Sequence, residues 1–459
     1  MNMPSAFDRI NNWIRNSVTI KLISIGILIL ILLIPTSMLQ SLVRERQDLF
    51  ENTIDELSSK WGNRQTIGGP VLSIPYLTPV KDDKGNIEYW THYVHFLPEE
   101  LNINGKILPE KRHRRIYVVV LYKSILHIEG KFGIPDFAAA GVDAAACQLD
   151  KAFISTGISD LRGVNDNINC SINGKNYLFG PGIPTHDVLE SGISFNFPVD
   201  STKEIPFSFD INLNGSSRLA FLPFGKVTNV NLSSPWNTPS FEGSFITDTN
   251  TVNDSGFVAN WKILQLNRNY PQQGTGSFIS KNKGNNNYMP DDNTYRGDDD
   301  YSSFGVRLLL PVDEYQKTMR SVKYCIMFII ITFLTFFFSE VLNKKRIHPI
   351  QYLLVGFAIC LFYVLLLSIS EHLSFGLSYL TGCVSIIILI SFYAKYVFRN
   401  NKLTAIFSFL LTLLYGFFYS LLQLEDYSLL LGSIGLFIIL ATIMYLTRKV
   451  NWYGNTVDG

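Results

Sequence analysis

Charged residues are scarce in this sequence, at 17% of 459 residues, whereas hydrophobic residues reach 47%. A soluble domain usually carries about 25% charged residues, so part of the chain is expected to lie in lipid. Basic and acidic residues nearly cancel, at 39 against 38, and the formal net charge is +1. This balance gives no general attraction to nucleic acid, and no nucleic-acid partner is predicted.

Cysteine is also scarce, with five residues in all. Cys325, Cys360 and Cys383 lie in apolar runs and are expected to be packing residues. Cys147 and Cys170 lie in the polar middle of the chain, where an oxidising compartment would allow a disulfide. Whether they pair stays open, because the sequence gives no Cα–Cα distance.

Most catalytic signatures are missing. The sequence contains no GxxxxGK[ST], HExxH, GxSxG or CxxC motif. Residues 280–283 match SxxK, but they begin a polar stretch without a rigid neighbour, so the match is interpreted as chance. We therefore predict no enzyme activity and no cofactor. An envelope enzyme is the lowest-ranked alternative, and it would need Asp160, Glu242 and Asp313 to form one cluster.

Metal binding is predicted to be absent as well. His92 and His95, near Glu88, are three residues apart and would face opposite sides of a strand. His113 lies in the basic run 111–115, which disfavours a cation and is interpreted as a solvated turn before a strand, with a contact to anionic headgroups or polymers as the alternative. The aspartates of the polar stretch 281–300 could collect Ca²⁺, although a solvated loop is the preferred interpretation.

Long apolar runs dominate both ends of the chain. A transmembrane helix needs about 20 apolar residues, and six windows qualify: 21–43, 322–340, 351–370, 374–394, 403–422 and 427–446. The first is too long for a signal-peptide core and lacks a clear cleavage site, so it is predicted to remain as an anchor. Residues 44–60 are expected to continue this helix out of the membrane. Residues 7–18 have helical apolar spacing and could be an interfacial helix or a disordered tail.

Lys and Arg alternate between the short loops and give the orientation. Basic residues precede the first window, fill the loops at 344–346 and 395–402, and follow the last window. The loops at 371–373 and 423–426 contain none. Both termini are therefore predicted to be cytoplasmic, with residues 44–320 outside.

Residues 44–320 show the period-two alternation of half-buried strands. Ile193, Phe195 and Phe197, for example, share one face of a predicted strand. Asn104-Gly105, Asn173-Gly174 and Asn214-Gly215 are predicted turns, and residues 136–148 are a candidate short helix. The sequence predicts an α+β membrane protein: a tail (1–20), helix 1 (21–43), a large β-rich, sandwich-like domain (44–320), five more transmembrane helices (321–447) and a tail (448–459).

Ionisable residues are absent from the centres of all six windows, which argues against a proton or ion path. Glu340 lies at the predicted cytoplasmic end of its helix. Glu371 and His372 lie at the outer end of theirs, beside Ser368 and Ser370. These four could form a polar cluster, although ordinary solvation of a helix end is the preferred interpretation.

Four motifs of the chain are HPIQYLLVG (348–356), LLLSISEH (365–372), DLRG (160–163) and PSFEG (239–243). These motifs resemble the CreD family of inner-membrane cell envelope integrity proteins. The resemblance supplies matching positions without assigned roles: Trp236, Phe241, Gly243, Trp261, Asp313, Tyr315, Glu340, His348, Pro349, Gln351, Tyr352, Ser368, Ser370, Glu371 and His372. Trp236 and Trp261 are expected in the domain core, and Gln351 and Tyr352 at the membrane interface.

The resemblance implies a bacterial inner-membrane location, a periplasmic β-domain, and a role in envelope integrity under a stress-response system. We therefore expect a non-enzymatic protein that supports or senses the envelope, with membrane lipids and an envelope protein or polymer as partners. The alternative is a lipid-handling or transport protein that uses its C-terminal helices.

Overall fold

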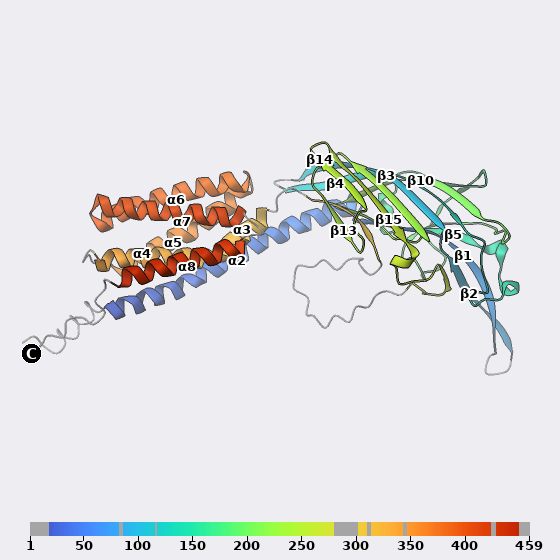
Figure 1. Cartoon of the computed structure of the whole chain (residues 1–459), viewed down its shortest axis with the longest axis horizontal. Coiled ribbons are helices and arrows are strands. Elements are labelled where there is room, and N and C mark those ends of the chain that lie inside the picture. The colour runs from blue at the N-terminus through green and yellow to red at the C-terminus, as the bar shows by residue number, and fades with distance from the viewer. Residues whose placement is uncertain are drawn as a thin grey trace, which may run out of the picture. The chain divides into compact units, whose positions relative to one another are not determined.

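The computed structural model of the chain describes residues 18–81, 86–114, 117–279, 302–309, 314–342, 347–423 and 428–448 (Figure 1). They form two compact units, a helical unit (Met1–Glu51 with Val312–Gly459) and a β unit (Asn52–Pro311). Several features considered above lie outside the described residues, namely most of the tail at 7–18, the match at 280–283, the polar stretch 281–300, the loop at 344–346 and Asp313.

Helix α2 (Val18–Trp61) is one uninterrupted helix of 44 residues that belongs to both units. Its first half exposes apolar side chains on the side away from the core of the helical unit, such as Ile23 (57%), Leu30 (64%) and Met38 (66%), whereas Leu32 and Val43 are buried. Such exposure is typical of a helix in contact with lipid. Its second half is charged and confirms the predicted continuation beyond residue 43.

The remaining helices follow the β unit in sequence. They are α3 (Glu314–Lys323), α4 (Cys325–Leu342), α5 (Pro349–Ser370), α6 (Phe375–Phe398), α7 (Asn401–Gln423) and α8 (Ser428–Thr447). Four helices, α2, α5, α6 and α7, are long and apolar enough to cross a bilayer, and α3 with α4 form a pair bent by 41° that gives a fifth span. The apolar part of α8 is shorter, so the predicted six spans are confirmed only in part.

Two sheets make up the β unit. The first, of nine strands in the described residues, contains β1 (Gln65–Lys81), β2 (Ile87–Phe96), β5 (Phe153–Ile158), β8 (Gly180–Pro181), β9 (Gly192–Asn196), β11 (Arg218–Phe221), β13 (Pro239–Gly243), β16 (Gln273–Thr275) and β17 (Phe304–Leu308). The second, of eight, contains β3 (Glu100–Arg114), β4 (Tyr117–Phe132), β6 (Asn169–Ile172), β7 (Lys175–Leu178), β10 (Ile205–Ser216), β12 (Val227–Ser234), β14 (Thr249–Asn253) and β15 (Gly256–Leu264).

One hydrophobic core joins the inner faces of both sheets. Leu72 and Ile154 of the first sheet share it with Ile103, Ile128 and Ile211 of the second, and all five are at most 1% exposed. This arrangement is a β-sandwich, as the alternating patterns predicted. The candidate helix at 136–148 is instead a turn followed by the 3₁₀ helix η1 (Ala144–Ala146).

Two of the three predicted Asn-Gly turns are wrong. Asn173-Gly174 does connect β6 to β7, with positive φ at both residues. Gly105 lies inside β3, where a Cβ would come within 2.7 Å of Leu126 and Leu232 side-chain atoms. Gly215 lies inside β10 against the ring of Tyr122. Both glycines therefore allow close packing within strands.

Candidate functional site

A buried carboxylate lies near the C-terminal end of α4, where Glu340 is 3% exposed. Its Oε1 accepts a hydrogen bond from Lys21 Nζ of α2 at 2.7 Å, and its Oε2 accepts one from the Tyr352 hydroxyl of α5 at 3.1 Å. A charge is costly to bury unless it is paired and hydrogen-bonded. The two donors meet this requirement, and they join three helices at one side chain.

A cavity of about 500 Å³ opens beside this carboxylate. Its polar lining comes from Lys21, Ser24, Glu340, His348 and Tyr352, and its remaining wall is apolar. One side of the helical unit therefore combines a cation, an anion and a hydroxyl around a space large enough for a small ligand or a lipid headgroup. We call this arrangement the Glu340 site.

The first turn of α5 forms one edge of the Glu340 site. His348 caps the helix, because its Nδ1 accepts the Ile350 N–H at 3.3 Å, while Gln351 Oε1 accepts the His348 N–H at 3.0 Å. Pro349 occupies the first helical turn, where proline is favoured. Tyr352 is buried at 3% exposure, and its hydroxyl donates to Glu340.

A second ion pair holds α2 within the helical unit at Arg46, whose Nε lies 3.7 Å from Glu371 Oε1. The rings of Phe50 in α2 and Tyr315 in α3 also pack against each other, with their centroids 5.8 Å apart. The polar cluster considered for the SISEH segment is not formed. Ser370 donates to the Leu367 carbonyl of its own helix, and Ser368 and His372 are exposed.

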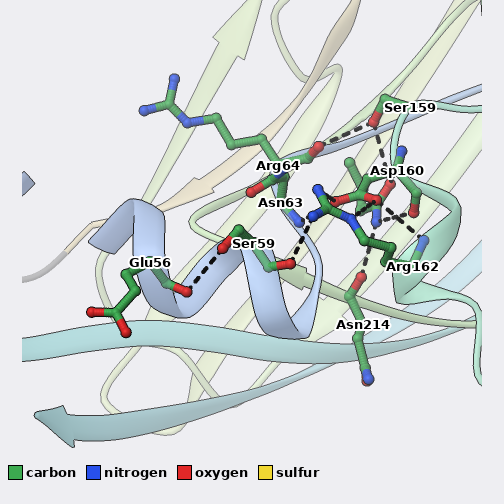
Figure 2. A network of polar contacts seen from close by, with 9 residues as sticks. Glu56, Ser59, Asn63, Arg64, Ser159, Asp160, Arg162 and Asn214 are labelled. Carbon is green, nitrogen blue, oxygen red and sulfur yellow. Dashed lines mark hydrogen bonds and ion pairs between the residues drawn. The ribbon is translucent and has the colours of Figure 1, made fainter. Parts of the chain in front are cut away.

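In the β unit, the last turn of α2 is held by the DLRG segment (Figure 2). Arg162 donates from Nη1 to the Ser59 carbonyl at 2.8 Å and pairs with Asp160 through Nε and Nη2, both at 2.9 Å. Asp160 Oδ2 also accepts the Asn63 N–H at 3.0 Å. We call Ser59, Asn63, Asp160 and Arg162 the helix-end network. Burial alone would raise the pKa of Asp160, but the hydrogen bonds from Arg162 and Asn63 outweigh it and hold this pKa below its usual range.

Two glycines allow the close approach that this network requires. Gly62 has φ +144°, and a Cβ there would lie 2.6 Å from the Asn214 carbonyl oxygen. A Cβ on Gly163 would lie 2.2 Å from the same oxygen. Gln65 Nε2 donates to this carbonyl at 3.1 Å, so no space remains for a side chain.

Trp61 fixes the same helix end from another side. Its indole donates to the Tyr122 carbonyl at 3.2 Å, and Arg112 lies over its ring at 5.2 Å from the centroid. The described part of the basic run, residues 111–114, is exposed as predicted, but it lies in strand β3 rather than in a turn. Arg114 pairs with Glu56 of α2 at 2.9 Å.

Three aromatic family positions, Trp236, Phe241 and Trp261, lie in or against the core of the β unit. Trp261 is 2% exposed and Trp236 is 7% exposed, as expected. Phe241 packs edge-on against Trp261 with centroids 5.8 Å apart. Gly243 has φ +112°, and a Cβ there would lie 2.2 Å from the Ser303 carbonyl oxygen. These residues contribute to the packing of β13, β15 and β17.

Ser73, His95 and Asp187 form a chain of hydrogen bonds that the sequence did not reveal. His95 Nε2 lies 3.2 Å from Asp187 Oδ2, and Nδ1 lies 2.8 Å from Ser73 Oγ. The carboxylate accepts from Nε2–H, so Ser73 donates to Nδ1 in the neutral ring. Ser73 and His95 are each 1% exposed, which leaves no route for a substrate to the hydroxyl. Burial lowers the pKa of His95, and Asp187 opposes this shift.

Of the three carboxylates considered for catalysis, Asp313 lies outside the described residues and the other two each pair with an arginine. Asp160 follows β5 and pairs with Arg162, whereas Glu242 of β13 pairs with Arg307 at 2.7 Å. Among the described residues, no group of three His, Cys, Asp or Glu side chains is placed to hold a metal ion. Cys147 and Cys170 are both free thiols.

An apolar helix that runs into a β-sandwich, followed by further apolar helices around a buried ion pair, defines an integral membrane protein with one large β-domain. The family described as "Inner membrane protein CreD" matches residues 17–453. The chain therefore belongs to the CreD family of inner membrane proteins. The inner membrane protein CreD of Escherichia coli (strain K12) is 30% identical over 440 residues, which cover 94% of this chain and 93% of that protein.

Proposed function

We propose that this chain is a non-enzymatic inner-membrane protein that senses or supports the integrity of the cell envelope. In this proposal the β unit lies in the periplasm and binds an envelope protein or polymer, and both termini are cytoplasmic. The distribution of Lys and Arg along the chain supports this orientation.

One observation carries the proposal. Helix α2 places Lys21 in the Glu340 site and Ser59 in the helix-end network without a break between them. A helix held at both ends by charged hydrogen bonds can carry a small displacement along its axis. Binding at the β unit would in this way alter the contacts of Glu340.

The experiment uses full-length protein in nanodiscs with an environment-sensitive dye on Ser24→Cys, in a Cys147→Ser background. Peptidoglycan fragments and envelope-protein extracts are added in turn. We expect one of them to bind and to shift the dye emission. Arg162→Ala should abolish the shift while binding persists. Binding with an equal shift in Arg162→Ala would refute coupling through α2, and failure of every envelope fraction to bind would refute the proposal itself.

A second function is supported by a groove of about 880 Å³ in the helical unit. Its lining is largely apolar and includes Met38 of α2, Phe357 and Leu361 of α5, and Leu389 of α6. Such a groove suits an acyl chain, which favours lipid handling as the alternative. Mass spectrometry of the purified protein tests it, since a handling role requires a specific lipid that Leu361→Trp excludes.

A further inference from the structure

Strands β1 and β2 continue past the sandwich as a two-stranded ribbon that projects beyond the other strands of the β unit in Figure 1. The inner end of β2 is buried, with Val94 at 0% exposure. The outer end is exposed on both faces and is apolar: Ile87 is 57% exposed, Tyr89 65% and Trp90 56%. This ribbon tip is a surface that the proposed function does not use.

The hydrogen bonds of the inner ribbon show which backbone groups point outward. The Pro75 carbonyl of β1 accepts a hydrogen bond from Gln148 N at 2.8 Å. The backbone groups of every second residue of β1 from Pro75 onward, including Pro79, therefore point away from β2. The Tyr93 carbonyl of β2 accepts a hydrogen bond from Gly276 N at 3.3 Å, so the backbone groups of Tyr93 point away from β1. By the same alternation, Ile87, Tyr89 and Thr91 direct their N–H and C=O groups to the outer edge.

The two edges of the ribbon differ in their protection. Pro79 has no N–H, which removes a donor from the β1 edge, and proline is a usual device against edge pairing. The β2 edge from Ile87 to Thr91 contains neither proline nor lysine. β16 covers this edge at 94–96 and Gly276 bonds to it at Tyr93, but no described residue bonds to the outward groups of 87, 89 and 91. An unprotected apolar edge is a template for another strand.

The edge complements itself. A two-fold axis through Tyr89 pairs the strand antiparallel with its own copy, so that Ile87 faces Thr91 of the second copy and Tyr89 faces Tyr89. All three outward residues then exchange their N–H and C=O groups. Glu88 faces Trp90 of the other copy and lies diagonal to both His92 and Glu88 of that copy, so no like charges are directly opposite each other.

We propose that two copies of this chain associate through the β2 edges, centred on Tyr89. This pairing continues the edge that β16 already extends. A contact of this length buries far less than the roughly 1,200 Å² of a stable complex in solution. Confinement in one membrane raises the effective concentration of the copies and compensates for the small contact.

The test is disulfide trapping of the full-length protein in membranes, in a Cys147→Ser background so that the remaining native thiols are buried. In the proposed register the Cα atoms of the two copies of residue 89 are about 5.5 Å apart, within disulfide range. Tyr89→Cys should therefore give an oxidised dimer on a non-reducing gel. Pro79→Cys, which lies opposite on β1, is the matched control, because three strand spacings put its two copies about 14 Å apart.

The proposed register also predicts the result for a second pair of cysteine variants. Ile87→Cys and Thr91→Cys should each cross-link weakly alone and several-fold more strongly when the two variants are mixed in one membrane. Equal cross-linking of Tyr89→Cys and Pro79→Cys would reflect random collision and would overturn the proposal. A Tyr89→Cys chain that remains monomeric, or that cross-links to a different protein, would also overturn it, and the latter would assign the edge to a foreign strand.

Discussion

The buried ion pair of the Glu340 site leads to a quantitative prediction. Lys21→Met removes one of the two donors to a carboxylate that is 3% exposed. Breaking a fully buried pair usually costs 3–5 kcal/mol, and because Lys21 is 30% exposed we expect the lower end, about 3 kcal/mol. The double variant Lys21→Met/Glu340→Leu should recover most of this loss, because replacing a buried pair by apolar residues is often neutral.

The assay is equilibrium unfolding of the full-length protein in mixed micelles, followed by helix content from circular dichroism. Lys395→Met is the matched control, since it removes an exposed lysine from the last turn of α6 and should change the free energy of unfolding by less than about 0.5 kcal/mol. Tyr352→Phe should cost about 1 kcal/mol, the net value of a hydrogen bond. If Lys21→Met were as mild as the control, Glu340 would not depend on this pair and the reasoning would be refuted.

Three further predictions concern the β unit. Gly163→Ala should destabilise it by about 1–3 kcal/mol through overpacking. Gly180→Ala should be nearly neutral, because its Cβ would have its nearest contact at 3.6 Å. Tryptophan fluorescence during unfolding measures the stability of both variants. Because burial lowers the pKa of His95, the unfolded state binds the proton first, so stability should fall as pH drops below about 6.5; a melting temperature that rises toward pH 5 would contradict this. Burial raises the pKa of Cys170 to about 12. Of the two thiols of the β unit, maleimide should therefore label Cys147 alone in the folded protein and both Cys147 and Cys170 in denaturant. Peptide mass spectrometry measures this labelling.

The sequence predicted those elements whose environment repeats along the chain. In the first half of α2, exposed residues such as Leu30 and Ile34 and buried residues such as Leu32 are alike apolar, so the window 21–43 is easy to recognise. The strand at Ile193 alternates because one of its faces is buried in the sandwich. The turns predicted at Gly105 and Gly215 are wrong, because glycine allows close packing as well as turns. Only the neighbouring side chain decides between the two roles.

The candidate site could be predicted only in part. Glu340 was noted as a family position at a helix end, but its partner Lys21 lies 319 residues away and was counted only as a topology charge. No local pattern joins the two. Asp160 was considered as a catalytic carboxylate, although Arg162 two residues later offered a local sign of its actual role, the capping of a 3₁₀ turn.

The order of strands in the first sheet constrains how the chain can fold during synthesis. β1 lies beside β11, which in turn pairs with β17, and Phe304–Leu308 is the last segment of the domain to be made. The edge of β1 at Gln65 therefore stays unpaired until β11 has been made, and the edge of β11 stays unpaired until almost the whole β unit has emerged. Such long-range pairing is slow and exposes strand edges to aggregation. This membrane protein should therefore depend strongly on holding chaperones before its C-terminal helices are inserted.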